Sequence, residues 1–231
     1  MRYVGISPSR RLFLRRAMRA APAALAAATV ANSIVTVAAP PAAVEYKPSY
    51  FTADEWNTLN AFVDRLIPHD AEGPGALEAG VAEFIDRQMA TPYAFGKLWY
   101  MDGPFMTVSD DFGYQLPLNP RDLYRRGLAE FQDAVQKKTG KGFAALTDAQ
   151  KDELLLALEK GTLLLATIPS RTFFGQVIQN THEGYFCDPK HGGNKNMAAW
   201  RMIGFPGARA DYMDWVEQYG KKYPFPPVSS A

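Results

Sequence analysis

The residues best suited to chemistry lie together in the stretch HEGYFCDPKHGGN, which begins at His182. It contains the chain's single cysteine, Cys187, and a second histidine, His191. Because imidazole and thiolate groups bind zinc and copper, a stand-alone exported metal-binding protein is one interpretation. The spacing H-x4-C-x3-H is no standard zinc pattern, however, and a fourth ligand would have to be Glu183 or Asp188. We therefore predict no metal ligand in this chain and keep the metal-binding protein as the alternative.

A cysteine–histidine pair in the same stretch could also act as a nucleophile and its base. Such catalysis needs an orienting third group and an oxyanion site, and the sequence indicates neither. Motifs for c-type haem, dinucleotides, nucleotide phosphates, serine hydrolases and zinc peptidases are also missing from the sequence. We therefore predict no catalytic and no cofactor-binding residue. Cys187 has no second cysteine to pair with, so it is either a buried thiol or half of an interchain disulfide.

The N-terminal part of the chain is typical of an export signal. The stretch SRRLFLR matches the twin-arginine pattern, which an Ala-rich apolar run and small residues suited to cleavage follow. We predict a twin-arginine signal peptide and Pro/Ala linker at 1–43 and a helical domain at 44–231. The pattern residues are Ser9, Arg10, Arg11, Phe13 and Leu14. Because this route exports folded cargo, the protein either holds a cofactor or travels docked to a partner that does.

The charges of the chain are unevenly placed. Six of the 25 basic residues precede Glu45, the first acidic residue, so the rest of the chain carries 19 basic and 24 acidic residues. A mildly acidic body gives no reason to expect nucleic-acid binding. We therefore predict no nucleic-acid partner.

The elements that must position the chemical residues are predicted to be helices, and the fold class is all-α with long ordered Gly/Pro loops. Apolar residues follow the helical period between Gly/Pro breaks, and no alternating strand of convincing length is present. Capping boxes are predicted at Thr52 with Glu55 and at Thr147 with Gln150. Helices are expected at 52–68, 75–89, 119–140, 148–161, 170–186, 197–204 and 208–220, and an ordered loop at 91–118.

One long stretch, FFGQVIQNTHEGYFCDPKHGGNKNMAAWRMIGFPGA, resembles the signature of gluconate 2-dehydrogenase subunit 3. In that family a helix that starts near paired Phe leads into an E-G-[FY]-F-x-D-P-x-x-G-G-N loop and then into G/A-W-x-x-I-G-F-P-G. The stretch DRLIPHDAEGPGALEAGVAEFIDRQM also looks like the family's first helical hairpin. The chain departs from the pattern at Cys187, where a small polar residue is usual, and at His191, where an aromatic is usual.

The resemblance implies an accessory role in an oxidoreductase complex that acts on sugars or alcohols. Family members accompany a large subunit that binds FAD, and a multihaem c-type cytochrome subunit passes electrons to membrane quinone. The small subunit is thought to assist maturation of the flavin subunit and to carry it through the twin-arginine translocase. The resemblance therefore implies a periplasmic protein at the outer face of the cytoplasmic membrane. A transient export chaperone, which leaves its partner after translocation, is a further alternative.

The stretch that begins at His182 is then best interpreted as a shaped loop that contacts the flavin subunit. Gly184 is predicted to end the preceding helix, and Asp188 with Pro189 favours a turn. The pair Gly192-Gly193 permits positive φ or a close backbone approach. The candidate interface residues are Tyr185, Phe186, Cys187, Asp188, His191, Gly192, Gly193, Asn194 and Trp200.

Overall fold

The computed structural model describes residues 46–106, 108 and 112–230. The twin-arginine residues and the whole predicted signal segment, 1–43, lie outside these described residues. No helix among the described residues is long and apolar enough to cross a membrane.

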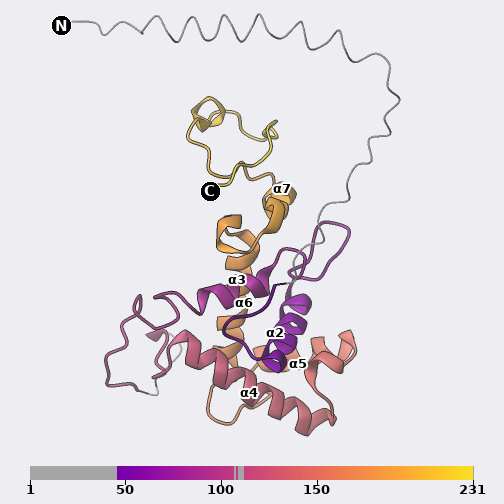
Figure 1. Ribbon diagram of the computed structural model, residues 1–231, viewed down its shortest axis with the longest axis vertical. Coiled ribbons are helices and arrows are strands. Elements are labelled where there is room, and N and C mark those ends of the chain that lie inside the picture. The colour runs from indigo at the N-terminus through magenta and orange to yellow at the C-terminus, as the bar shows by residue number, and fades with distance from the viewer. Residues whose placement is uncertain (1–45, 107, 109–111, 231) are drawn as a thin grey trace, which may run out of the picture. The chain divides into compact units, whose positions relative to one another are not determined.

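The described residues form six α-helices joined by turns and short 3₁₀ segments, and they contain no strand. Figure 1 shows helices packed on one another without a sheet, which confirms the all-α prediction. The α-helices are α2 (Ala53–Leu66), α3 (Val81–Gln88), α4 (Pro120–Thr139), α5 (Asp148–Glu159), α6 (Ser170–Phe186) and α7 (Ala198–Ile203). The 3₁₀ segments are η2 (Phe143–Ala145), η3 (Pro189–His191), η4 (Lys195–Met197) and η5 (Tyr212–Trp215).

Helix α6 is the central element, because α2, α3, α4, α5 and α7 all contact it. Its buried side chains join an aromatic core in which Phe173 contacts Phe62 and Phe131, and these two rings also contact Phe143. The rings of Phe131 and Phe143 lie 4.9 Å apart, centre to centre, in an edge-to-face arrangement that suits their quadrupoles. Gly127 of α4 leaves the room that the Phe173 ring occupies.

Most helix ends lie where local sequence signals predict them. Both capping boxes are present, with the Thr52 and Thr147 hydroxyls accepting from backbone N–H groups three residues on. Asn119 caps α4, and Gly140 ends it in a left-handed conformation with φ 71°. The described residues of the segment 91–118 form turns and loop, as predicted.

Three sequence predictions about elements are wrong. The helix expected at 75–89 begins only at Val81, because Gly80 has φ 73° and breaks the helical path. The helix expected at 208–220 is reduced to the short segment η5. Gly184 lies inside α6 instead of ending it; there it makes room for Phe84 of α3, whose Cδ1 would lie 2.7 Å from a Cβ at this position.

A buried carboxylate fixes the segment that leads into α2. Asp86 of α3 is fully buried, and its two oxygens accept five hydrogen bonds from residues 46–51. Three of the five donors are backbone N–H groups, at Ser49, Tyr50 and Phe51. Burial raises the pKa of Asp86, but these hydrogen bonds lower it by more, so the pKa lies below its ordinary value.

Candidate functional site

The loop after α6 is shaped by side chains that hydrogen-bond to its backbone. Helix α6 ends at Phe186, and Cys187 follows it in extended conformation. Oδ1 of Asp188 accepts from the Lys190 N–H at 3.2 Å and starts η3, with Pro189 in the first position. Gly192 ends η3 with φ 97°, a backbone conformation that residues other than glycine rarely adopt. The turn predicted at Asp188-Pro189 is confirmed, and Gly192 has the positive φ that the glycine pair was predicted to permit.

The second glycine of the pair allows a close backbone approach. A Cβ on Gly193 would collide with the carbonyl oxygen of Gly184 and lie 2.9 Å from Sγ of Cys187. A Cβ on Gly192 would lie 2.6 Å from Cδ of Arg87. The loop therefore packs flat against both α6 and α3, and only glycine fits at these two positions.

Buried hydrogen bonds tie this loop to α7. Asn194 is fully buried; its Nδ2 donates to the Cys187 carbonyl at 2.9 Å, and its Oδ1 accepts from the Ala199 N–H at 3.0 Å. The indole N–H of Trp200 donates to the Phe186 carbonyl at 2.7 Å. These bonds satisfy buried polar groups and fix where α7 leaves the loop.

A charged cluster ties the same region to α3. Glu83 is almost fully buried, and its two oxygens pair with Arg87 and Lys195, each at 2.6 Å. The Lys195 N–H also donates to the Ala79 carbonyl at 3.1 Å. Each cation alone can compensate the buried carboxylate, so its charge is left unpaired only if both partners are removed, which is costly.

The predicted interface residues fall into two groups. Tyr185 is only 2 % exposed, and its hydroxyl donates to the Pro74 carbonyl; Trp200 is 6 % exposed. The expectation that these two side chains are presented at a surface is therefore wrong for this chain. Gly192, Gly193 and Asn194 are buried as well. The remaining four candidates, Phe186, Cys187, Asp188 and His191, are exposed or half-buried.

The structure does not bring the three metal-ligand candidates together. His182 lines a hollow of about 280 Å³ beside Tyr185 and Met202, whereas Cys187 and His191 line a different hollow next to α3. Among the described residues, no group of three His, Cys, Asp or Glu side chains is arranged to hold a metal ion. Burial raises the pKa of the Cys187 thiol to about 11, so the thiol is protonated at neutral pH and is a weak nucleophile.

Asp188 attaches the C-terminal tail, which we define as residues 208–230, to the loop. Its carboxylate accepts from the Ser229 hydroxyl at 2.5 Å and from the Ser230 N–H at 2.7 Å. The tail also closes on itself where the Ala208 N–H donates to the Val228 carbonyl at 2.8 Å. Partial desolvation raises the pKa of Asp188, but the hydrogen bonds from the two serines lower it by more, and it lies well below its ordinary value.

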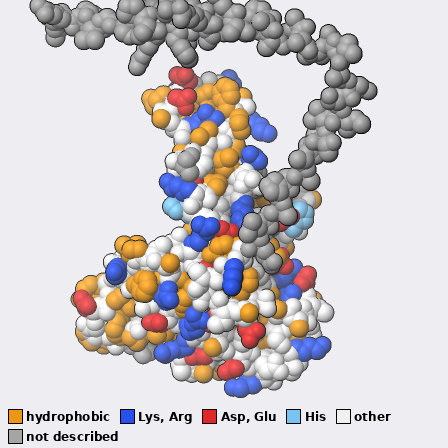
Figure 2. Space-filling model, in the orientation of Figure 1, with side chains coloured by type: hydrophobic (Ala, Val, Ile, Leu, Met, Phe, Trp, Pro, Cys, Tyr) orange, Lys and Arg blue, Asp and Glu red, His pale blue; other side chains and the backbone are white. Residues whose placement is uncertain are grey.

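An exposed apolar surface lies over α7 and the tail, and sequence reasoning missed it. Four of its exposed side chains, here called the strip, come from the end of α6, from α7 and from the residue after Gly204: Phe186, Met202, Ile203 and Phe205. Figure 2 shows orange hydrophobic side chains gathered over this part of the molecule. The only signal in the sequence was that MAAWRMIGF holds more apolar residues than a six-residue helix can bury on one face. The tail adds further exposed apolar residues, namely Tyr212, Met213, Val216, Tyr219, Phe225 and Val228.

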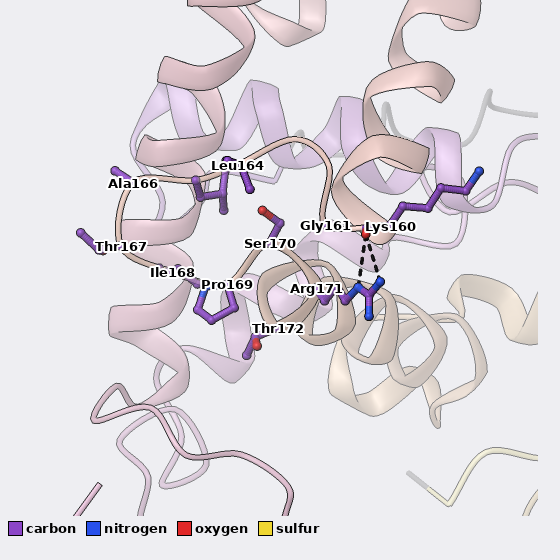
Figure 3. A pocket seen from close by; sticks show the side chains of 11 residues that line it. Lys160, Gly161, Leu164, Ala166, Thr167, Ile168, Pro169, Ser170, Arg171 and Thr172 are labelled. Atoms are coloured by element: carbon purple, nitrogen blue, oxygen red, sulfur yellow. Dashed lines mark hydrogen bonds between the residues drawn. The ribbon is translucent and has the colours of Figure 1, made fainter. Parts of the chain in front are cut away.

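A separate hollow of about 480 Å³ lies at the start of α6, between Lys160 and Thr172 (Figure 3). The side chain of Arg171 points toward the Lys160 carbonyl, to which its Nε and Nη2 donate. Nearby, the Glu130 carboxylate accepts from the N–H groups of Thr167 and Ile168. These two backbone donors are therefore already used within the chain.

The fold and the site together define a helical protein with a rigid braced loop and a large exposed apolar surface, which is typical of a subunit that binds other proteins. The family model for Gluconate 2-dehydrogenase subunit 3 matches residues 53–207, and the chain belongs to this family. A search of curated proteins and a search of solved structures gave no match. The family is named for the third subunit of a complex, so membership implies partner subunits. The tail lies beyond the matched residues.

Proposed function

We propose that this chain is the non-catalytic small subunit of a periplasmic, membrane-associated dehydrogenase complex of the gluconate 2-dehydrogenase type. It assists the maturation of a large FAD-binding subunit, accompanies it through the twin-arginine translocase and stabilises it afterwards. The substrate is a sugar, a sugar acid or an alcohol, and it is oxidised on the partner's flavin. The flavin supplies hydride acceptance, and no residue of this chain takes part in that step.

The observation that carries this proposal is the exposed apolar strip formed by Phe186, Met202, Ile203 and Phe205. A protein that works alone gains nothing from several exposed large apolar side chains in one part of the molecule, because they favour association and aggregation. The strip rests on the braced loop, so its side chains are held in place before a partner arrives. Preorganisation of this kind lowers the entropic cost of binding.

Export supports the second half of the proposal. The pattern from Ser9 to Leu14 favours the twin-arginine route, which carries folded cargo, and a partner without its own signal can cross only when docked. In the complete complex a multihaem c-type cytochrome subunit with haem c receives the electrons and passes them to the membrane. This arrangement places the complex at the outer face of the cytoplasmic membrane.

The experiment is affinity purification of the tagged chain from periplasm, with flavin and haem absorbance as readouts. The wild-type chain should bring down a large flavin-bearing partner, and Ile203→Glu should bring down at least tenfold less, because a charge in an apolar contact is left desolvated. Leu164→Glu is the matched control, since Leu164 is also exposed but lies far along the chain in the hollow at the start of α6.

Two results would contradict the proposal in different ways. A lone colourless chain in periplasm, with the partner bound only in cytoplasm, indicates a transient chaperone. Equal recovery of the partner with Ile203→Glu removes the strip as the contact surface. A paired Arg10→Lys and Arg11→Lys variant should leave both proteins in the cytoplasm, and export of the variant would remove the twin-arginine assignment.

A further inference from the structure

A second surface feature lies on the opposite half of α6 from the braced loop. It is a hollow of about 330 Å³, here called the Gly175 notch, whose walls are Trp99 and Tyr114 and whose floor is Gly175, Gln176 and Gln179 of α6. The volume is at the lower end of the range for small-molecule sites, about 300 to 1,000 Å³, and suits one small ring. The two aromatic rings lie 5.0 Å apart, centre to centre.

No contact among the described residues explains the glycine in the floor. Gly175 lies in the middle of a 17-residue helix, where glycine weakens the helix relative to alanine. The other two glycines inside helices make room for aromatic rings, Gly127 for Phe173 and Gly184 for Phe84. A Cβ on Gly175 would meet nothing within 4 Å among the described residues. The missing side chain therefore leaves space that the described chain does not use.

A chain of amides places a hydrogen-bond acceptor in this space. The Glu183 carboxylate can only accept, so Asn180 must turn its Nδ2 toward it, at 2.7 Å. Oδ1 of Asn180 then faces Gln176, whose Nε2 donates to it at 2.8 Å and to the Tyr93 hydroxyl at 2.7 Å. This fixes the amide of Gln176, which lines the notch and is 6 % exposed, and leaves its Oε1 as the atom that these two bonds do not use. No described residue donates to that oxygen.

The other polar lining groups are two neutral side chains and one cation. Thr172 adds a hydroxyl and Gln179 a second amide oxygen, while the guanidinium of Arg171 is held at the Lys160 carbonyl, 3.1 Å from Nη2 (Figure 3). A ligand that fits must donate to fixed amide oxygens and also present an apolar face to the aromatic wall. Sugars do both, through their O–H groups and their C–H faces. We propose that the Gly175 notch binds a monosaccharide. This site belongs to the chain itself and does not depend on the proposed partners.

The test uses the full chain labelled with 5-fluorotryptophan and followed by fluorine NMR during titration with D-glucose, D-galactose, D-fructose or myo-inositol. Trp99→Phe assigns the Trp99 signal among the four tryptophans. At least one of these compounds should shift the Trp99 signal with a dissociation constant of about 1 mM, the affinity expected for a dozen atoms at ordinary ligand efficiency.

Gly175→Leu fills the notch and should abolish the shift. Ala149→Leu, at an exposed position of α5, is the matched control and should retain it. Gly175→Ala folds at least as well as wild type because alanine is the better helix former, and it should weaken binding several-fold. The proposal is overturned if none of the four compounds shifts the Trp99 signal, or if Gly175→Leu binds as tightly as wild type. It is also overturned if Gly175→Leu loses the co-purified flavin partner and no compound binds, which makes the notch a protein contact.

Discussion

Replacing Asp86 with asparagine should be among the most damaging single-atom changes in the described part of this protein. The substitution keeps the size of the side chain but turns one of its two acceptor oxygens into an NH₂ group. If the amide nitrogen takes the place of Oδ1, it faces the N–H groups of Tyr50 and Phe51. If it takes the place of Oδ2, it faces the Ser49 N–H and the hydroxyls of Ser49 and Tyr46. Either orientation therefore leaves buried donors facing another donor.

The size of the effect follows from these lost bonds. Hydrogen bonds to a charged group contribute about 1.5 to 3 kcal/mol each, and at least two are lost with buried N–H groups left unpaired. The free energy of unfolding should fall by about 3 to 4 kcal/mol, within the range measured when a buried charged network is broken. For a domain of this size that corresponds to about 6 to 16 °C in melting temperature. Asp133→Asn, at an exposed position of α4, is the matched control and should change stability by under about 0.5 kcal/mol.

The pH dependence gives an independent readout. The pKa of Asp86 is lowered in the folded state, so its contribution is present above the unfolded pKa of about 3.9 and is lost as pH falls through the lower folded pKa. The difference in stability between wild type and Asp86→Asn should be constant above about pH 5 and shrink below about pH 4.

The assays are thermal and urea unfolding by circular dichroism between pH 3 and pH 8, with hydrogen exchange of the Ser49, Tyr50 and Phe51 amides. These three amides should lose protection in the variant before the amides of α4 and α6 do. A stability within about 1 kcal/mol of wild type, or unchanged protection of the three amides, would refute the claim that Asp86 holds this segment.

Three further predictions follow from other sites. Gly193→Val should lower the free energy of unfolding by about 2 kcal/mol or more in urea titrations, because the new side chain collides with the Gly184 carbonyl. The control, Gly142→Val, places its side chain in open space and should change the free energy of unfolding by under about 0.5 kcal/mol. The Cys187 thiol should react with iodoacetamide about 100-fold more slowly at pH 7 than an ordinary thiol, with a rate that rises toward pH 11; a profile centred near pH 8.5 would contradict its burial. Thr147→Ala should cost about 1 kcal/mol through the lost cap, and thermal unfolding checks this against Thr162→Ala, whose hydroxyl makes only an exposed 3.2 Å contact to Ala157.

The predictable parts of the fold are those that depend on neighbours in sequence. A capping box needs residues three positions apart, and the helix stripes repeat every three or four residues, so both can be found without knowing the fold. Asp86 carries no such signal, because its donors lie 35 to 40 positions earlier in the chain. The role of Gly184 was misjudged for the same reason. Its neighbour in space is Phe84, and no local pattern indicates that contact.

The position of the candidate site could be predicted from the sequence, but which of its residues are exposed could not. The residues of the stretch that begins at His182 do form a shaped loop, yet most of the candidates expected to contact a partner are buried in contacts with α3, α6 and α7. Residue type alone cannot separate an aromatic side chain that faces a partner from one that braces a loop. Trp200 and Phe205 are both aromatic and five positions apart, but only Phe205 stays exposed. That difference is decided by where α7 leaves the loop.

In this proposal the braced loop supports the exposed strip, and the strip contacts the partner. Variants can test these two roles separately. Gly193→Val damages the support, so it should lower stability and partner recovery together. Ile203→Glu changes only an exposed side chain at the end of α7, so it should lower partner recovery with stability near wild type. If the loop itself were the contact surface, His191→Ala would reduce recovery more than Ile203→Glu, since His191 is an exposed loop candidate with a large side chain. The order of these two variants decides between a loop that binds the partner and a loop that holds the binding surface in place.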